Sequence, residues 1–132
     1  MVDTPESVSA DILIVEDDAQ VRAMLRKMLE VAGFRVREAT NGKDAMKSWK
    51  ALRPDLVITD VLMPEMDGFE VITTLRKLDP QSKIIAITGG GAAKLTNLLP
   101  AAKHLGASRT LEKPFERDEL LKQVRELLQR TA

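Results

Sequence analysis

Apolar and polar positions along the chain fall into two kinds of short pattern. Continuous apolar runs occupy 12–15, 56–59 and 83–88, and each is typical of a strand that is covered on both faces. The stretches 34–38 and 109–112 mix apolar and polar residues, as strands with one wet side do. The patterns therefore predict three interior strands and two edge strands.

Helical spacing of apolar residues fills the intervals between these strands. It predicts a helix over 21–32, which ends at Gly33, and a helix over 97–106 that keeps Pro100 in its first turn. Asn41-Gly42 turns the chain into another helix, in which we interpret Trp49 as core filling rather than a ligand platform. The remaining helices present these apolar faces: Ala45, Met46, Trp49 and Leu52; Phe69, Val71, Ile72, Leu75 and Leu78; Phe115, Leu120, Leu121, Val124, Leu127 and Leu128.

Strict alternation of strands and helices predicts a parallel sheet with helices on both faces and right-handed crossovers. With 34–38 and 109–112 at its edges, the strand order is 2-1-3-4-5, a doubly wound (βα)5 α/β fold of the flavodoxin type. Ligands bind such sheets at the carboxyl ends of the strands where the winding reverses, here between strands one and three. We expect a single domain over 11–130 after a flexible lead-in over 1–10, and no output domain.

Composition adds no new functional class and serves only to exclude some. Lysine plus arginine and aspartate plus glutamate number 20 each, so the net charge is zero and predicts no attraction to nucleic acid or membranes. The absence of cysteine excludes disulfides and thiolate chemistry, and fits a reducing compartment. No apolar run approaches the roughly 20 residues of a membrane span. We expect a cytoplasmic protein.

Chemically active residues follow four of the predicted strands. They are Glu16, Asp17 and Asp18 after the first, Asp60 after the third, Thr88 at the end of the fourth and Lys113 at the end of the fifth. Asp60 could simply start a turn, and Asp18 is a good helix N-cap. Thr88 and Lys113 have ordinary explanations as a strand residue and a solvated charge.

The acids are harder to explain in this way, because acids at neighbouring strand ends repel unless a cation lies among them. Donor sets made only of oxygen favour a hard ion, above all Mg²⁺. A dication, a lysine and a hydroxyl around one carboxylate form a pocket that suits a phosphoryl group. The residues therefore predict phosphoryl chemistry in which Asp60 can serve as the nucleophile.

This combination of motifs resembles the CheY-like receiver domains of two-component response regulators, here of the stand-alone type. The resemblance covers about 11–130 and is specific as a combination, although each motif alone is weak. The motifs are Ile-Leu-Ile-Val-Glu-Asp-Asp at 12–18, Asp60 followed by Met63-Pro64 and Asp67-Gly68, Ile87-Thr88, and Gly-Ala-Ser at 106–108 before Lys113-Pro114-Phe115.

The resemblance implies a phosphoprotein that works in a two-component system or phosphorelay and is not a turnover enzyme. Asp60 would accept a phosphoryl group from a phosphohistidine on a histidine kinase or a histidine phosphotransfer protein. Asp17, Asp60 and the backbone carbonyl of Leu62 would ligate Mg²⁺ directly, whereas Glu16 would act largely through water. We assign Asp18 to the helix cap, because the acidic pair of the family falls on Glu16 and Asp17.

The phosphoryl group itself would be held by residues at the other strand ends. Lys113 would contact it, and the peptide bond between Lys113 and Pro114 would be cis. Thr88 would close onto the phosphoryl group and signal activation. Leu62 and Gly90 occupy positions that tune the access of water to the acyl phosphate.

Two departures from the family pattern concern activation. Many receivers carry an aromatic residue three positions before the lysine, where this chain has Thr110, so the usual coupling of threonine and aromatic ring is missing. The segment between Thr88 and Lys113 is longer than usual and contains a triglycine at 89–91, whose high backbone entropy predicts mobility.

The output would be a contact with a downstream protein. The expected surface comprises the fourth helix, the fifth strand and the fifth helix, and includes Lys103, Arg109 and Thr110. The kinase-docking face would be Ala19, Gln20 and Val21 with Pro114 and Phe115. We interpret His104 as a surface residue and expect a monomer or weak dimer.

Two other functional classes remain. An aspartate-nucleophile phosphatase would place its nucleophile in an Asp-x-Asp motif after the first strand, where this chain has Glu16-Asp17-Asp18, and would need a cap insertion for which 132 residues leave little room. An interaction module that has lost phosphorylation is the third class, although every chemical residue of the site is present.

Overall fold

Strands and helices alternate strictly along the described part of the chain, which comprises 10–61, 68–89 and 98–129 in this computed structural model. The strands are β1 (Asp11–Val15), β2 (Arg35–Ala39), β3 (Leu56–Asp60), β4 (Ile84–Gly89) and β5 (Arg109–Lys113). The helices are α2 (Ala19–Val31), α3 (Gly42–Ala51), α4 (Gly68–Leu78), α5 (Leu98–Leu105) and α6 (Arg117–Gln129). The strands pair in parallel in the order β2-β1-β3-β4-β5, which confirms the predicted fold.

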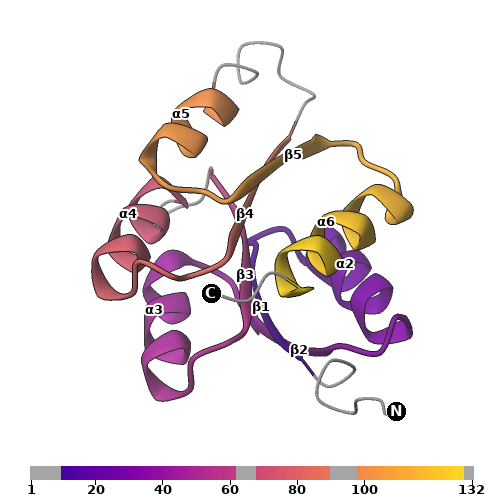
Figure 1. Ribbon diagram of the computed structural model, residues 1–132. Coiled ribbons are helices and arrows are strands. Elements are labelled where there is room, and N and C mark those ends of the chain that lie inside the picture. The colour runs from indigo at the N-terminus through magenta and orange to yellow at the C-terminus, as the bar shows by residue number, and fades with distance from the viewer. Residues whose placement is uncertain (1–9, 62–67, 90–97, 130–132) are drawn as a thin grey trace.

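Helices cover both faces of the sheet, with α2 and α6 on one side and α3, α4 and α5 on the other (Figure 1). Successive strand residues point to opposite faces. In β1, Ile12 and Ile14 enter the core beneath α2 and α6, whereas Leu13 and Val15 enter the core on the other side. Every residue of β1 is therefore buried, which explains its continuous apolar run.

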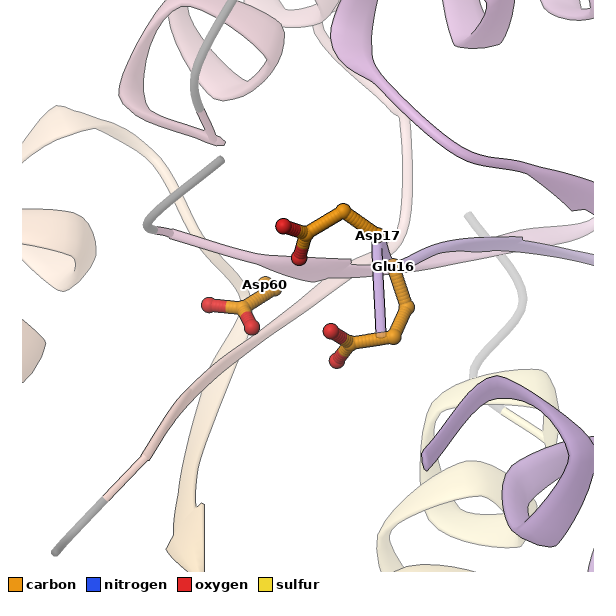
Figure 2. A group of neighbouring side chains, drawn as sticks. All are labelled: Glu16, Asp17 and Asp60. Atoms are coloured by element: carbon orange, nitrogen blue, oxygen red, sulfur yellow. The ribbon is translucent and has the colours of Figure 1, made fainter. Parts of the chain in front are cut away.

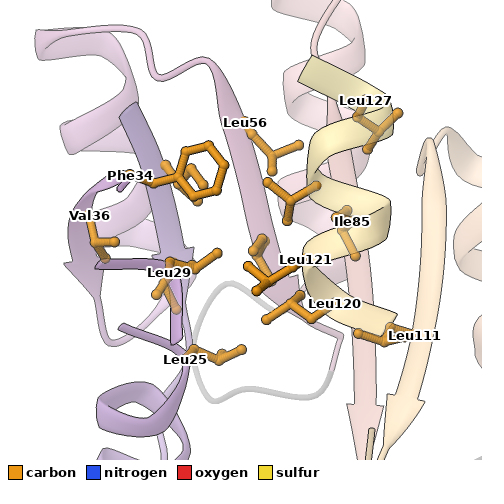
Figure 3. Packing of buried hydrophobic residues seen from close by; sticks show 14 of the residues in the cluster. Leu25, Leu29, Phe34, Val36, Leu56, Ile85, Leu111, Leu120, Leu121 and Leu127 are labelled. Carbon is orange, nitrogen blue, oxygen red and sulfur yellow. The ribbon is translucent and has the colours of Figure 1, made fainter. Parts of the chain in front are cut away.

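The core beneath α2 and α6 packs both helices against the same face of the sheet. Figure 3 shows Leu25 and Leu29 of α2 and Leu120 and Leu121 of α6 directed into this layer. Burial of one such leucine contributes about 1.5–3 kcal/mol relative to its exposure. The β1 strand end, from which the acids emerge, thus rests on a rigid support.

Helix ends follow the signals in the sequence. Asp18 caps α2 by accepting hydrogen bonds from the backbone N–H groups of Gln20 (2.9 Å) and Val21 (3.2 Å). The side chain of Asn41 caps α3 in the same way. Gly33 follows α2 with φ of 103°, a left-handed conformation that favours glycine.

Two residues assigned to apolar helix faces do not belong there. Leu52 is 63% exposed and Leu78 is 44% exposed. Helix α3 ends at Ala51, and Leu52 has an extended backbone that directs it away from the helical face. Trp49, in contrast, is buried in the core as predicted, with the Arg53 guanidinium 4.7 Å from its ring centre.

The remaining predictions concern the ends and the edges of the domain. The predicted lead-in over 1–10 lies outside the described residues except for Ala10, which belongs to the core. Strands β2 and β5 are partly exposed, as predicted for edge strands. None of the described helices is long and apolar enough to cross a membrane.

Candidate functional site

The first and third strands bring Glu16 and Asp60 together at the carboxyl edge of the sheet. Val15 lies opposite Thr59 in the parallel register of β1 and β3, so the next residue of each strand is one of these acids. The backbone N–H of Glu16 donates to the Ala39 carbonyl of β2 at 3.0 Å. Sheet hydrogen bonding therefore fixes the backbone at the start of the acidic segment.

Three carboxylates converge at this edge, as the sequence predicts. Glu16, Asp17 and Asp60 each offer an oxygen, and these oxygens lie within 4.8 Å of one another (Figure 2). Glu16 is 2% exposed and Asp60 is 7% exposed, whereas Asp17 is exposed. The opening to solvent thus lies on the side of Asp17.

Lys113 reaches this group from the end of β5, the edge strand that is separated from β3 by β4. Its Nζ donates to Oε1 of Glu16 at 3.0 Å and to Oδ2 of Asp60 at 3.2 Å. The side chain of Lys113 is only 19% exposed, so Lys113 is not the solvated surface charge of the ordinary explanation. The predicted meeting of residues from the first, third and fifth strands is confirmed.

Charge balance at the site is unfavourable for Glu16. Burial first, and then the negative charge of Asp60, raise the pKa of Glu16 to about 7, against hydrogen bonds from Lys113 and the Asp18 N–H. Burial alone would lower the pKa of Lys113, but the hydrogen bond to Glu16 and the charges of Asp60 and Glu16 outweigh it and raise that pKa. One ammonium group therefore does not neutralise the buried carboxylates.

The acidic segment makes a second set of contacts that the sequence did not reveal. Arg22 of α2 donates from Nη1 to the main-chain carbonyl of Glu16 at 2.9 Å, and from Nε to Oε1 of Glu38 at 2.7 Å. The only indication of this contact in the sequence is the position of Arg22, six residues after Glu16 and one helical turn before Arg26. Every residue has a main-chain carbonyl, so the pattern of side chains does not indicate which carbonyl accepts a hydrogen bond.

Some predicted site residues are placed only in part or lie outside the described residues. Thr88 lies in β4 opposite Glu112, and its side chain lies outside the described residues. Leu62 and Gly90 lie wholly outside the described residues, as do Met63, Pro64 and Asp67 of the motif. The peptide bond between Lys113 and Pro114 is cis, as the resemblance implies.

The predicted contact surfaces are accessible in most of their described residues. Ala19, Gln20 and Pro114 are exposed, whereas Val21 and Phe115 are partly buried against the core. On the opposite flank, Lys103 and His104 are exposed. Arg109 pairs with Glu126 at 2.8 Å, and the carbonyl of the half-buried Thr110 accepts a hydrogen bond from Gln123.

The donor set fits a hard divalent cation. Carboxylate oxygens are the ligands that Mg²⁺ prefers, and thiolate is absent from the chain. A dication would also offset the repulsion that raises the pKa of Glu16. Glu16, Asp17 and Asp60 are therefore the residues that could hold the ion.

Comparison with known proteins agrees with this geometry. The model of the response regulator receiver domain family matches residues 12–125. The chain is similar to the chemotaxis protein CheY of Thermotoga maritima, with 41% identity over 106 residues that make up 80% of this chain and 86% of that protein. It is also similar to the response regulator MprA of Mycolicibacterium vanbaalenii, with 39% identity over 91% of this chain.

The chain spans about half the length of that MprA protein, 51% of it. Among solved structures, the signal receiver domain of a histidine kinase from Syntrophus aciditrophicus superposes with a TM-score of 0.83 at 31% identity. That match covers 94% of this chain and 96% of the other.

Proposed function

Because the chain belongs to the response regulator receiver domain family, we propose that it is a phosphorylatable receiver with Asp60 as the phosphoacceptor. Such domains act in two-component signalling and are not, in general, turnover enzymes. The phosphoryl donor would be a phosphohistidine on a histidine kinase or a histidine phosphotransfer protein.

One observation carries this proposal. Lys113 and two further acids surround the Asp60 carboxylate from the ends of β1 and β5, in a site that is buried except near Asp17. A carboxylate that only began a turn would not need a partly buried lysine at 3.2 Å. The arrangement supports a reactive carboxylate rather than a structural one.

The proposed reaction is a phosphoryl transfer. A carboxylate oxygen of Asp60 attacks phosphorus and forms the new P–O bond as the P–N bond to the donor imidazole breaks. The imidazole nitrogen leaves with the electron pair of that bond and takes up a proton. The ammonium group of Lys113 lies where it can neutralise a phosphoryl oxygen.

Glu16, Asp17 and Asp60 would hold Mg²⁺ beside the reacting group. When bound, the ion supplies positive charge to the phosphoryl oxygens. The exposed Asp17 leaves one side of the site open to a donor, and the start of α2 together with Pro114 forms the adjoining exposed surface.

The phosphorylated state would be recognised by another protein, or the phosphoryl group would pass onward in a phosphorelay. The surface of α5, β5 and α6 is the proposed contact face. Because Thr110 offers no aromatic ring, the signal from Thr88 would depend on main-chain movement of β4 and β5, whose residues 88 and 112 are paired.

The test is phosphorylation by acetyl phosphate with Mg²⁺, followed by intact-protein mass spectrometry. We expect one phosphoryl group on the wild type and none on Asp60→Asn. Equal modification of the variant contradicts the assignment of Asp60, and sustained hydrolysis of a phosphomonoester by the wild type would favour a phosphatase instead.

A further inference from the structure

Arg22 connects the acidic segment to the edge strand. Its Nη1 donates to the Glu16 carbonyl at 2.9 Å and its Nε donates to Glu38 of β2 at 2.7 Å. The side chain of Arg22 is only 17% exposed. A guanidinium group is rigid and planar, so two contacts of this kind fix its orientation.

The Glu16 carbonyl belongs to the peptide unit that joins two of the three converging acids. Rotation of this unit would change the direction in which Asp17 leaves the backbone, and with it the place of the Asp17 carboxylate. The sheet holds the Glu16 N–H through Ala39 at 3.0 Å, but that contact lies on the other side of the Glu16 Cα. Among the described residues, Arg22 provides the recorded side-chain contact on the carbonyl side.

Glu38 is in turn anchored by a second arginine. Arg26, one helical turn after Arg22, pairs with the other oxygen of Glu38 and with Glu30 at 3.0 Å. Arg26 thus belongs to the same group of ion pairs and carries the same charge, but its recorded contacts lie with Glu30 and Glu38 rather than with the Glu16 carbonyl. This difference provides a matched control.

We propose that Arg22 is a positioning residue of the cation site, which holds the Glu16–Asp17 peptide so that both carboxylates face Asp60. The inference rests on the proposed function, because it concerns the affinity of that site for a divalent cation. Arg22 touches neither the ion nor the phosphoryl group, and acts through the main chain.

The charge of Arg22 and its proposed positioning role predict opposite changes in metal affinity when Arg22 is replaced. Arg22 is a cation near a cation site, so its charge alone weakens metal binding, and removal of that charge would strengthen it. Loss of the carbonyl contact instead releases the Glu16–Asp17 peptide and weakens binding. The sign of the change therefore separates positioning from simple electrostatics.

The experiment is a titration with Mn²⁺, which prefers similar oxygen donors, monitored by the electron paramagnetic resonance signal of the free ion. We expect Arg22→Gln to weaken Mn²⁺ binding about tenfold, the low end of the range for residues that orient metal ligands. Arg22→Lys keeps the charge but lacks the fork, and we expect it to weaken binding as well. Arg26→Gln should bind Mn²⁺ as the wild type does, or slightly more tightly.

Phosphorylation by acetyl phosphate gives a second readout. We expect Arg22→Gln to reach the wild-type rate when Mg²⁺ is raised about tenfold, because only the affinity for the ion is changed. Thermal unfolding in a chelator should shift similarly for Arg22→Gln and Arg26→Gln, since each loses two contacts: Arg22 loses one ion pair and the carbonyl contact, and Arg26 loses two ion pairs.

Two results would overturn the inference about Arg22. The first is unchanged or tighter Mn²⁺ binding by Arg22→Gln, and the second is equal weakening by Arg26→Gln, which would indicate a general loss of structure. Failure of the proposed function looks different, because the wild type itself would then not bind Mn²⁺.

Discussion

Two groups of charged side chains lie on either side of the Glu16 peptide, and they differ in charge balance and in burial. The site cluster comprises Glu16, Asp17, Asp60 and Lys113, with a formal charge of −2 when all are ionised. The outer ion pairs comprise Arg22, Arg26, Glu30 and Glu38, whose formal charges cancel. The two groups use the same chemistry, but only the second is balanced.

One acid in each group has a shifted pKa, and the two shifts have opposite directions. In the outer ion pairs, the hydrogen bond from Arg26 lowers the pKa of Glu38, with a further contribution from Arg22. In the site cluster, burial and the charge of Asp60 raise the pKa of Glu16 to about 7. The outer ion pairs therefore favour the ionised form of Glu38, whereas burial and Asp60 oppose ionisation of Glu16.

The two groups therefore have different roles. Balanced, partly exposed ion pairs hold helix α2 against strand β2. An unbalanced group that buries two carboxylates, Glu16 and Asp60, works against folding, so its presence at the carboxyl edge of the sheet is better explained by a ligand. Both groups meet at the Glu16 peptide, where Arg22 makes the connection.

The largest effect is expected from removal of the ammonium group of the site cluster. Lys113→Met leaves Glu16 and Asp60 buried without this partner, and loss of one partner from a buried ion pair costs about 3 kcal/mol. We expect that loss in the free energy of unfolding in urea at pH 8 in a chelator.

Magnesium should restore part of the lost stability, because binding to the folded state alone stabilises it and the variant site is more negative. A loss of unfolding free energy below about 1 kcal/mol in Lys113→Met would be no larger than that of exposed ion pairs. It would contradict the distinction between the site cluster and the outer ion pairs.

The next effect is the dependence of stability on pH. Because the pKa of Glu16 is raised from 4.5 to about 7, the folded protein binds more protons than the unfolded chain between these values. Glu16 therefore contributes stability that is complete below pH 4.5 and is lost as the pH rises through 7. We expect a loss on the order of 3 kcal/mol in the metal-free protein.

Glu16→Gln should lack this part of the pH dependence, as measured by urea unfolding at several pH values in a chelator. The difference between wild type and variant isolates Glu16 from the other titrating groups. Identical pH profiles of the two proteins would show that Glu16 is ionised at neutral pH in the folded state.

The smallest effect belongs to the outer ion pairs. Arg26→Gln removes contacts with Glu30 and Glu38 that are partly exposed, and such contacts contribute less than about 1 kcal/mol. We expect the change in unfolding free energy to fall further in high salt. A change as large as that of Lys113→Met would remove the distinction between the two groups.

Much of the fold can be predicted from the sequence, because strands and helix ends are determined by residues that are close together in the chain. Continuous apolar runs mark the interior strands, and Asp18 and Gly33 mark the ends of α2. The strand order follows from which strands are apolar throughout. Leu52 was misassigned because the helical spacing continues one residue beyond α3, and sequence spacing does not show where the backbone becomes extended.

The site could be predicted as a set of residues but not as a set of contacts. Strand ends in a parallel sheet lie on one edge, so Asp60 and Lys113 could be brought together from the topology alone. The bond from Arg22 to the Glu16 carbonyl has a main-chain acceptor, which every residue offers and no pattern selects. The same applies to Arg76, which donates to the Gly106 carbonyl at 2.7 Å and packs where a side chain at Gly106 would stand.

The most direct test of the unbalanced site cluster is the number of protons released when Mg²⁺ binds. Because the pKa of Glu16 is about 7, its carboxyl group is half protonated at pH 7, and a divalent cation beside it, whether bound directly or through water, favours the ionised form. Calorimetric titration in two buffers of different ionisation enthalpy measures this release. We predict about half a proton per Mg²⁺ for the wild type at pH 7, and almost none at pH 9 or in Glu16→Gln. Binding of Mg²⁺ at pH 7 without proton release by the wild type would contradict the raised pKa of Glu16.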